Sequence, residues 1–146
     1  MPSPRATRAP RVLHVLNTFV TGGAETYVAR LADALAEREF TVCAAGGRCE
    51  DARRIAPTAP GVDIVDLPFQ TTHRSPRRHA ANVARCTVAL LRLVRARRID
   101  VVHTSLAASA LPAWLAARIA GVPTVHTLMH THEVAGPLER RVFTSG

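Results

Sequence analysis

Short apolar runs alternate along this chain with longer segments whose apolar residues recur at helical spacing. Residues 11–18 are nearly continuous in Val and Leu and end before a pair of glycines, which is typical of a strand buried on both faces. Apolar residues then recur every three to four positions from Ala24 to Leu35 and predict a helix that ends near Glu39. Residues 40–45 return to a short apolar run and predict a second strand.

The same alternation continues through the rest of the chain. We expect further strands at residues 62–67, 99–104 and 122–128. Helices are expected at residues 50–56, 79–97 and 106–120. Pro76 lies in a polar and basic segment and is interpreted as a breaker before the long helix, whereas Pro112 falls where the first turns of a helix tolerate it. Gly121 is suited to the C-terminal cap of the last helix.

Strands that alternate with helices predict right-handed β-α-β units and a parallel sheet covered on both faces. We therefore expect one doubly wound, Rossmann-like α/β domain at residues 11–146, with strand order 3-2-1-4-5, after a disordered lead at residues 1–10. Ligands of such sheets bind at the carboxyl ends of the strands, where the strand order reverses. This rule singles out the loops at residues 19–23, 103–105 and 128–132.

Composition narrows the class of protein. The 146 residues are 47% hydrophobic and 21% charged, which fits one folded domain and excludes a collagen-like or largely disordered chain. The 19 basic and 11 acidic residues give a net charge of +8, and every basic residue is arginine. A GC-rich genome explains this bias, and an anionic partner is the alternative. Aromatic residues make up only 4%, and no nucleic-acid-binding motif is present, so nucleic acid is not an expected partner.

The cysteines bear on location and on metal binding. Cys43, Cys49 and Cys86 are odd in number and form no C-x-x-C pair, so we expect neither a disulfide framework nor a zinc site. They fit a reducing, cytoplasmic compartment. The apolar run at residues 12–16 is too short and too polar for a signal peptide, and no stretch reaches the roughly 18 apolar residues of a membrane span. Any contact with a membrane is expected to be peripheral, at its inner face.

Two glycines follow the first predicted strand. Gly22 and Gly23 have no Cβ, so the backbone at this turn can approach a ligand closely. The free N–H groups at the start of the next helix favour an anion, and phosphate or diphosphate is the natural ligand. The segment matches neither G-x-G-x-x-G nor the P-loop pattern. From spacing alone, a plain tight turn explains the glycines equally well.

Several segments resemble the amino-terminal domain of family 4 glycosyltransferases, which are retaining enzymes with the GT-B fold. The matching segments are the strand at residues 12–17, Gly-Gly-Ala-Glu at 22–25, Leu-Ala-Glu-Arg at 35–38, Asp-Val-Val-His at 100–103 and Gly-Val-Pro-Thr-Val at 121–125. Each motif alone is weak. Their order and spacing across roughly residues 11–130 carry the resemblance.

The resemblance implies roles for the matched positions. Gly22 and Gly23 would bring backbone N–H groups to the diphosphate of a nucleotide-sugar across an interdomain cleft. Glu25 belongs to the same motif and would bind substrate there, or would only complement the helix dipole. His103 would lie at the end of the fourth strand, face the cleft and contact the substrate.

The loop after the fifth strand carries the predicted catalytic residue, His130. The family often has a histidine two residues after a threonine at this place, where it touches the sugar or the acceptor. Here Thr127 is followed at that distance by Met129, and His130 comes one position later. Either the loop is shifted by one residue or the usual contact is lost. His126, His130 and His132 also have metal-like spacing, but only Glu133 lies nearby as an acidic partner, so we predict no metal and no other cofactor.

Length sets a further expectation. The family's second domain binds the nucleotide-sugar and carries a Glu-x7-Glu motif with basic residues that stabilise the leaving diphosphate. Nothing after Leu128 matches these features. We therefore expect residues 11–146 to be half of a GT-B fold, truncated before the donor-binding domain. An isolated domain, a truncated gene product and one chain of a split enzyme all remain open.

A basic flank lies on the connection before the long helix and on the helix itself. Its arginines are Arg74, Arg77, Arg78, Arg85, Arg92 and Arg95. Related enzymes with lipid-linked acceptors carry a basic surface near this place. We therefore predict an anionic membrane surface as a partner, faced by Arg74, Arg77, Arg78 and Arg85. A solvated arginine face explains the same pattern.

Together these observations predict the acceptor-side domain of a glycosyltransferase. The complete enzyme would transfer a sugar from a nucleotide-sugar to a hydroxyl acceptor with retention of configuration. The alternative is a non-catalytic Rossmann-like module that binds a partner chain or an anionic ligand, including one chain of a split transferase.

Overall fold

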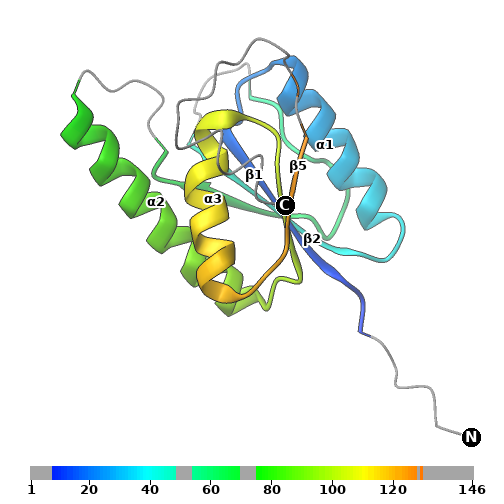
Figure 1. Cartoon of the computed structure of the whole chain (residues 1–146). Coiled ribbons are helices and arrows are strands. Elements are labelled where there is room, and N and C mark those ends of the chain that lie inside the picture. The colour runs from blue at the N-terminus through cyan, green and yellow to red at the C-terminus, as the bar shows by residue number, and fades with distance from the viewer. Residues whose placement is uncertain (1–7, 49–53, 70–74, 128, 130–146) are drawn as a thin grey trace, which may run out of the picture.

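The computed structural model describes residues 8–48, 54–69, 75–127 and 129. Within these residues, five parallel strands form one sheet in the order β3-β2-β1-β4-β5 (Figure 1). The strands are β1 (Arg11–Thr18), β2 (Thr41–Gly47), β3 (Asp63–Leu67), β4 (Val101–Thr104) and β5 (Thr124–His126). The helices are α1 (Gly23–Ala36), α2 (Pro76–Arg97) and α3 (Ala107–Ala120). The predicted Rossmann-like fold and its strand order are confirmed.

The helices form two layers, one on each face of the sheet (Figure 1). α1 packs on one face against β1 and β2, whereas α2 and α3 pack together on the other. Side chains alternate along β1, so that Leu13 and Val15 join the core beneath α2 and α3. Leu16 joins the smaller core beneath α1, and the same alternation places His14 on that face.

Apolar burial holds the central strands in place. In the larger core, Leu90 of α2 is 0% exposed and packs with β1, β4 and a row of small residues on α3. That row consists of Ala113, Ala116 and Ala117. The absence of large side chains there lets α3 lie close to the sheet and to α2. On the other face, Phe19 is fully buried and packs with Val28 of α1.

Two predicted element boundaries and one predicted helix are corrected by the structure. α2 begins at Pro76 itself rather than after it, because a proline at the first helical position loses no helix hydrogen bond and already has a helical φ. The last strand is shorter than residues 122–128. Most of the predicted helix at 50–56 lies outside the described residues, but Arg54 forms a bridge with Val20 instead of a helical turn, and the N–H of Ile55 donates to the carbonyl of Phe19 at 2.8 Å.

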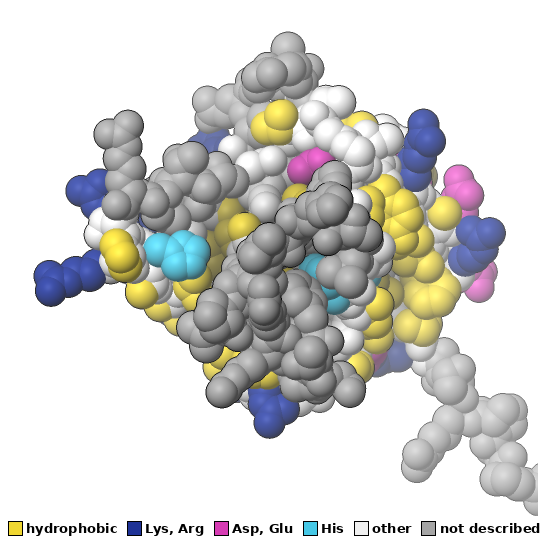
Figure 2. Space-filling view, turned by 45° about the horizontal axis from the view of Figure 1, so that its top comes forward, with side chains coloured by type: hydrophobic (Ala, Val, Ile, Leu, Met, Phe, Trp, Pro, Cys, Tyr) yellow, Lys and Arg dark blue, Asp and Glu magenta, His cyan; other side chains and the backbone are white. Residues whose placement is uncertain are grey.

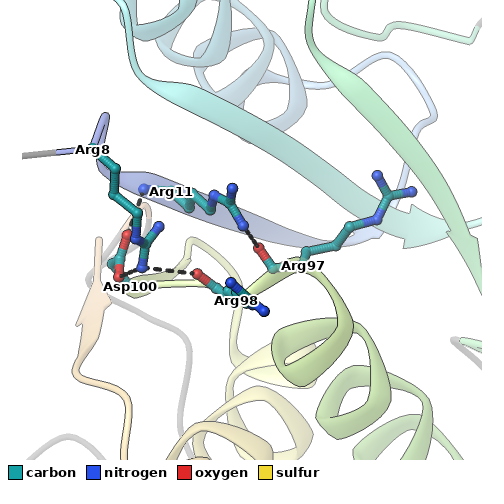
Figure 3. A network of polar contacts seen from close by, with 5 residues as sticks. All are labelled: Arg8, Arg11, Arg97, Arg98 and Asp100. Atoms are coloured by element: carbon teal, nitrogen blue, oxygen red, sulfur yellow. Dashed lines mark hydrogen bonds and ion pairs between the residues drawn. The ribbon is translucent and has the colours of Figure 1, made fainter.

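A polar network ties the amino ends of β1 and β4 to the end of α2 (Figure 3). One carboxylate oxygen of Asp100 accepts the backbone N–H of Arg11 at 2.8 Å, and the other accepts the Arg8 guanidinium at 2.6 Å. The Arg11 guanidinium donates to the carbonyl of Arg97 at 2.9 Å, and Arg98 caps the helix with a φ of 51°. This network lies at the opposite end of the sheet from the Gly-Gly turn. Of the predicted disordered lead, residues 1–7 lie outside the description.

Candidate functional site

The Gly-Gly turn lies at the carboxyl ends of the strands, between β1 and α1. Gly22 is the N-cap of α1 and has extended backbone geometry, and Gly23 is the first helical residue and is exposed. The first N–H groups of a helix have no partner within the helix, so an exposed start is suited to an anion. β1 and β4 are neighbours at the centre of the sheet, and the connections from their ends run to opposite faces. The turn therefore lies at the point where ligands of such sheets bind.

Glu25 folds back over this turn. A Cβ built on Gly22 would collide with a carboxylate oxygen of Glu25, so the carboxylate lies directly against the N-cap. Thr26 closes the first turn, since both its N–H (3.0 Å) and its hydroxyl (2.7 Å) donate to the carbonyl of Gly22. A carboxylate in the first helical turn stabilises the positive end of the helix dipole. Glu25 therefore occupies part of the space that a bound phosphate would need.

A groove of about 550 Å³ begins at the turn and follows the outer face of α1. Its lining residues are Thr21, Gly22, Gly23, Thr26, Tyr27, Arg30 and Leu31. Tyr27 is 40% exposed, and the exposed Arg30 adds a positive charge two helical turns from the glycines. Figure 2 shows apolar side chains gathered at the right of the view, on the side where α1 lies in Figure 1. The groove thus combines an open helix start, a cation and an apolar wall.

His103 lies in β4 but is only 6% exposed. Its Nδ1 is 2.8 Å from Nδ1 of His14 on β1, and its Nε2 is 2.8 Å from the hydroxyl of Thr127 after β5. Both ring nitrogens therefore have partners inside the protein. Burial lowers the pKa of His103, and the neighbouring His126 lowers it further. Direct contact of His103 with a substrate stays a prediction, and this arrangement does not favour it.

His14 is the most strongly perturbed of the histidines that the structure describes. It is 1% exposed, and burial together with the adjacent His103 lowers its pKa to about 3. Its Nε2 has no hydrogen-bond partner among the described residues. The sequence analysis missed the pairing, although a signal was present. His14 and His103 lie in two strands that the predicted order puts side by side, and the observed register, which strand order alone does not specify, makes them partners.

The other predicted site residues are spread over the molecule. Arg77, Arg78 and Arg85 are exposed on α2, on the opposite face from α1, and the start of α2 points toward the same end of the sheet as the Gly-Gly turn. Arg74 and His130 lie outside the described residues. The structure therefore brings together Gly22, Gly23 and Glu25 but does not place His103 on their groove.

The described residues include no cluster of possible metal ligands. Within residues 8–48, 54–69 and 75–127, no three His, Cys, Asp or Glu side chains lie so that they could hold a metal ion. His126 instead places Nδ1 2.6 Å from the hydroxyl of Thr104. Among the same residues, none of the helices is both long and apolar enough to cross a bilayer.

Residues 21–144 match the profile of Glycosyltransferase Family 4. Because this match spans most of the sequence and the fold agrees with half of a GT-B enzyme, the chain belongs to this family. No curated protein matches the sequence.

Solved structures share the fold at low sequence identity. A glycosyltransferase from Rickettsia africae ESF-5 superposes with a TM-score of 0.66 at 15% identity, covering 94% of this chain and 34% of its own. A sucrose-phosphate synthase from Thermosynechococcus elongatus gives 0.65 at 14% identity, covering 93% and 39%. MurG of Acinetobacter baumannii gives 0.58 at 18% identity, covering 80% and 34%. The chain thus spans little more than a third of the length of these proteins.

Proposed function

We propose that this chain is the acceptor-side domain of a glycosyltransferase that transfers a sugar from a nucleotide-sugar to a hydroxyl group with retention of configuration. Family membership supports glycosyl transfer in general. The observation that carries the proposal for this chain is the exposed start of α1 at Gly22 and Gly23, at the carboxyl ends of the strands. Breaking the donor's glycosidic bond leaves charge on a diphosphate, and preorganised N–H donors stabilise such charge.

The groove along α1 suggests a role for each residue in binding the diphosphate. The N–H groups at Gly22 and Gly23 bind diphosphate oxygens, and Arg30 adds positive charge to the groove. Glu25 complements the empty helix start and has to move aside when phosphate binds. His130 stays the predicted catalytic residue of the loop after β5, in a register shifted by one from Met129.

The donor-binding half is proposed to come from outside these residues. The solved relatives are between about two and three times as long, so one further domain, or a separate partner chain, fits the remaining length. That half would hold the nucleotide and the acidic and basic residues of the leaving-group site. We place the assembled enzyme in the cytoplasm.

Binding of a nucleoside diphosphate tests this proposal directly. UDP and GDP are titrated into ¹⁵N-labelled protein, and we expect shifts at the amides of Gly22, Gly23 and Ala24. A Cβ at Gly23 meets no atom within 4 Å, so we expect Gly23→Val to fold while its branched side chain screens the amides. The matched control is Ala108→Val, which places the same side chain on an exposed position near the start of α3. The proposal is wrong if neither nucleotide shifts these amides, or if G23V responds as the unaltered chain does.

The arginines of α2 support a second proposal, that the domain docks on an anionic membrane surface. Arg77, Arg78 and Arg85 are exposed, and α2 carries no acidic residue from Pro76 to Arg97. Each basic side chain near an anionic surface contributes about 1 kcal/mol. The triple variant R77Q/R78Q/R85Q should therefore lose most salt-sensitive sedimentation with phosphatidylglycerol vesicles. The control removes exposed arginines elsewhere, at Arg38 and Arg118, and equal losses in both variants would reject this surface.

A further inference from the structure

Apolar packing holds β5 only weakly. The strand has three residues, Thr124 and Val125 are exposed, and Val125 is 52% exposed. Central strands of the same sheet are almost completely buried, as Leu13 and Val102 illustrate. Yet β5 ends at the carboxyl edge of the sheet, the region that the proposed function uses, and Thr127 follows it directly. Something other than hydrophobic burial has to fix the position of Thr127.

Side-chain hydrogen bonds fill this role on both faces of the sheet. On the α1 face, Nδ1 of His14 lies 2.8 Å from Nδ1 of His103, and Nε2 of His103 lies 2.8 Å from the Thr127 hydroxyl. On the α3 face, the Thr104 hydroxyl lies 2.6 Å from Nδ1 of His126. The backbone N–H of Thr127 also donates to the carbonyl of Thr104 at 2.9 Å. A series of linked hydrogen bonds therefore connects β1 through β4 to the first residue after β5.

The position of the proton on His103 determines which atom donates in each of its two hydrogen bonds. Only one of the two facing Nδ1 atoms can carry a proton, because a hydrogen bond needs one donor and one acceptor. If His14 donates, a neutral His103 must carry its own proton on Nε2 and donate it to Thr127. If His103 donates instead, its bare Nε2 accepts the Thr127 hydroxyl. In either case the neutral imidazole of His103 is oriented by His14 at one end and holds Thr127 at the other.

We propose that His103 is a positioning residue, which together with His14 holds Thr127 and so fixes the backbone directly after β5. Buried polar groups are stabilising only when they are paired, and here the pairing joins three segments of the chain. The inference deepens the proposed function, since this backbone is part of the site only if that function holds. The positioning itself does not depend on any ligand.

Amide hydrogen exchange at Thr127 tests the proposal. Thr127→Val keeps the shape of the side chain and removes its hydroxyl, whereas Thr127→Ser restores a hydroxyl. Loss of one hydrogen bond should lower the protection factor of this amide by about three- to tenfold in T127V. T127S should stay close to the unaltered chain. His103→Asn keeps a hydrogen-bonding group near Nδ1 but removes Nε2, and it should lower the protection of the Thr127 amide as well.

A matched control separates local loosening from general destabilisation. Thr87 lies in α2, and its hydroxyl donates to the carbonyl of Val83 at 2.8 Å. Thr87→Val thus removes a similar bond elsewhere and should leave the protection of Thr127 unchanged. Equal protection in T127V, T127S and the unaltered chain would overturn the positioning role. UDP titration of the same samples reports separately on the proposed function, because a failure of UDP to bind would leave the exchange result standing.

Discussion

The buried histidine pair makes the stability of this domain sensitive to mild acid. Folding places His14 at 1% exposure beside His103, where a proton on either ring loses the solvation that water gives it. The perturbation is acidification from pH 7 to pH 5, applied to the unaltered chain and to His14→Asn. The variant keeps a hydrogen-bonding group near Nδ1 and removes the titratable imidazole.

The magnitude follows from the pKa of His14, which burial lowers from 6.5 to about 3. Between these values the unfolded chain binds a proton that the folded chain does not, so the free energy of unfolding falls as the pH falls below 6.5. The slope is about 1.4 kcal/mol per pH unit, which amounts to about 2 kcal/mol by pH 5 and about 4 to 5 kcal/mol by pH 3. The pKa of His103 is lowered as well and adds a loss of the same sign.

Urea unfolding followed by the fluorescence of the single tryptophan, Trp114, measures this loss at pH 7, 6 and 5. H14N will be less stable at pH 7, but its free energy of unfolding should fall by about 2 kcal/mol less between pH 6.5 and pH 5. The control is Thr87→Val, which removes a hydrogen bond of α2 but no titratable group and should keep the original pH dependence. If H14N and the unaltered chain lose stability in parallel, the burial argument is refuted.

Three further predictions concern packing and the Gly-Gly turn. Leu90→Ala empties the centre of the larger core and should lower the free energy of unfolding by about 2 to 5 kcal/mol in urea. A Cβ at Gly47 would lie 2.5 Å from the backbone oxygen of Asn17, so G47A should cost about 1 to 3 kcal/mol in the same assay, whereas G23A should be nearly neutral. Glu25→Gln removes the carboxylate at the helix start and should tighten UDP binding about two- to fivefold in a calorimetric titration. Weaker binding by E25Q would instead make this carboxylate a substrate contact.

The pattern of hydrophobic and polar residues predicts the strands and helices of this domain well, because these elements depend on local periodicity. The Val- and Leu-rich run at residues 11–18 coincides with β1, and the glycine at position 121 caps α3 with a φ of 72° as expected. Pro76 was misread because a proline that breaks a helix and a proline that begins one look alike in sequence. The residue before it, Ser75, is a favoured N-cap type and is the N-cap of α2, so it was the available signal for a helix start.

The candidate site was less accessible to prediction because it depends on contacts between distant segments. Gly22, Gly23 and Glu25 are neighbours in sequence, so their shared turn was predicted. The burial of His103 was not, since it depends on a partner 89 residues away and on a hydroxyl beyond the next strand. Strand register decides which side chains meet across a sheet, and one sequence without its fold does not specify it.

The contacts of Asp100 bear on which loops of this fold can vary in sequence. It accepts the backbone N–H of Arg11 in β1 and the guanidinium of Arg8, which precedes β1, at the edge of the sheet opposite the Gly-Gly turn. This contact between the two middle strands does not involve the loops at the other edge. Sequence changes in the loops at the carboxyl ends of the strands therefore leave this contact between β1 and the residue before β4 in place. Those loops can vary while the opposite edge of the sheet keeps the same polar contacts.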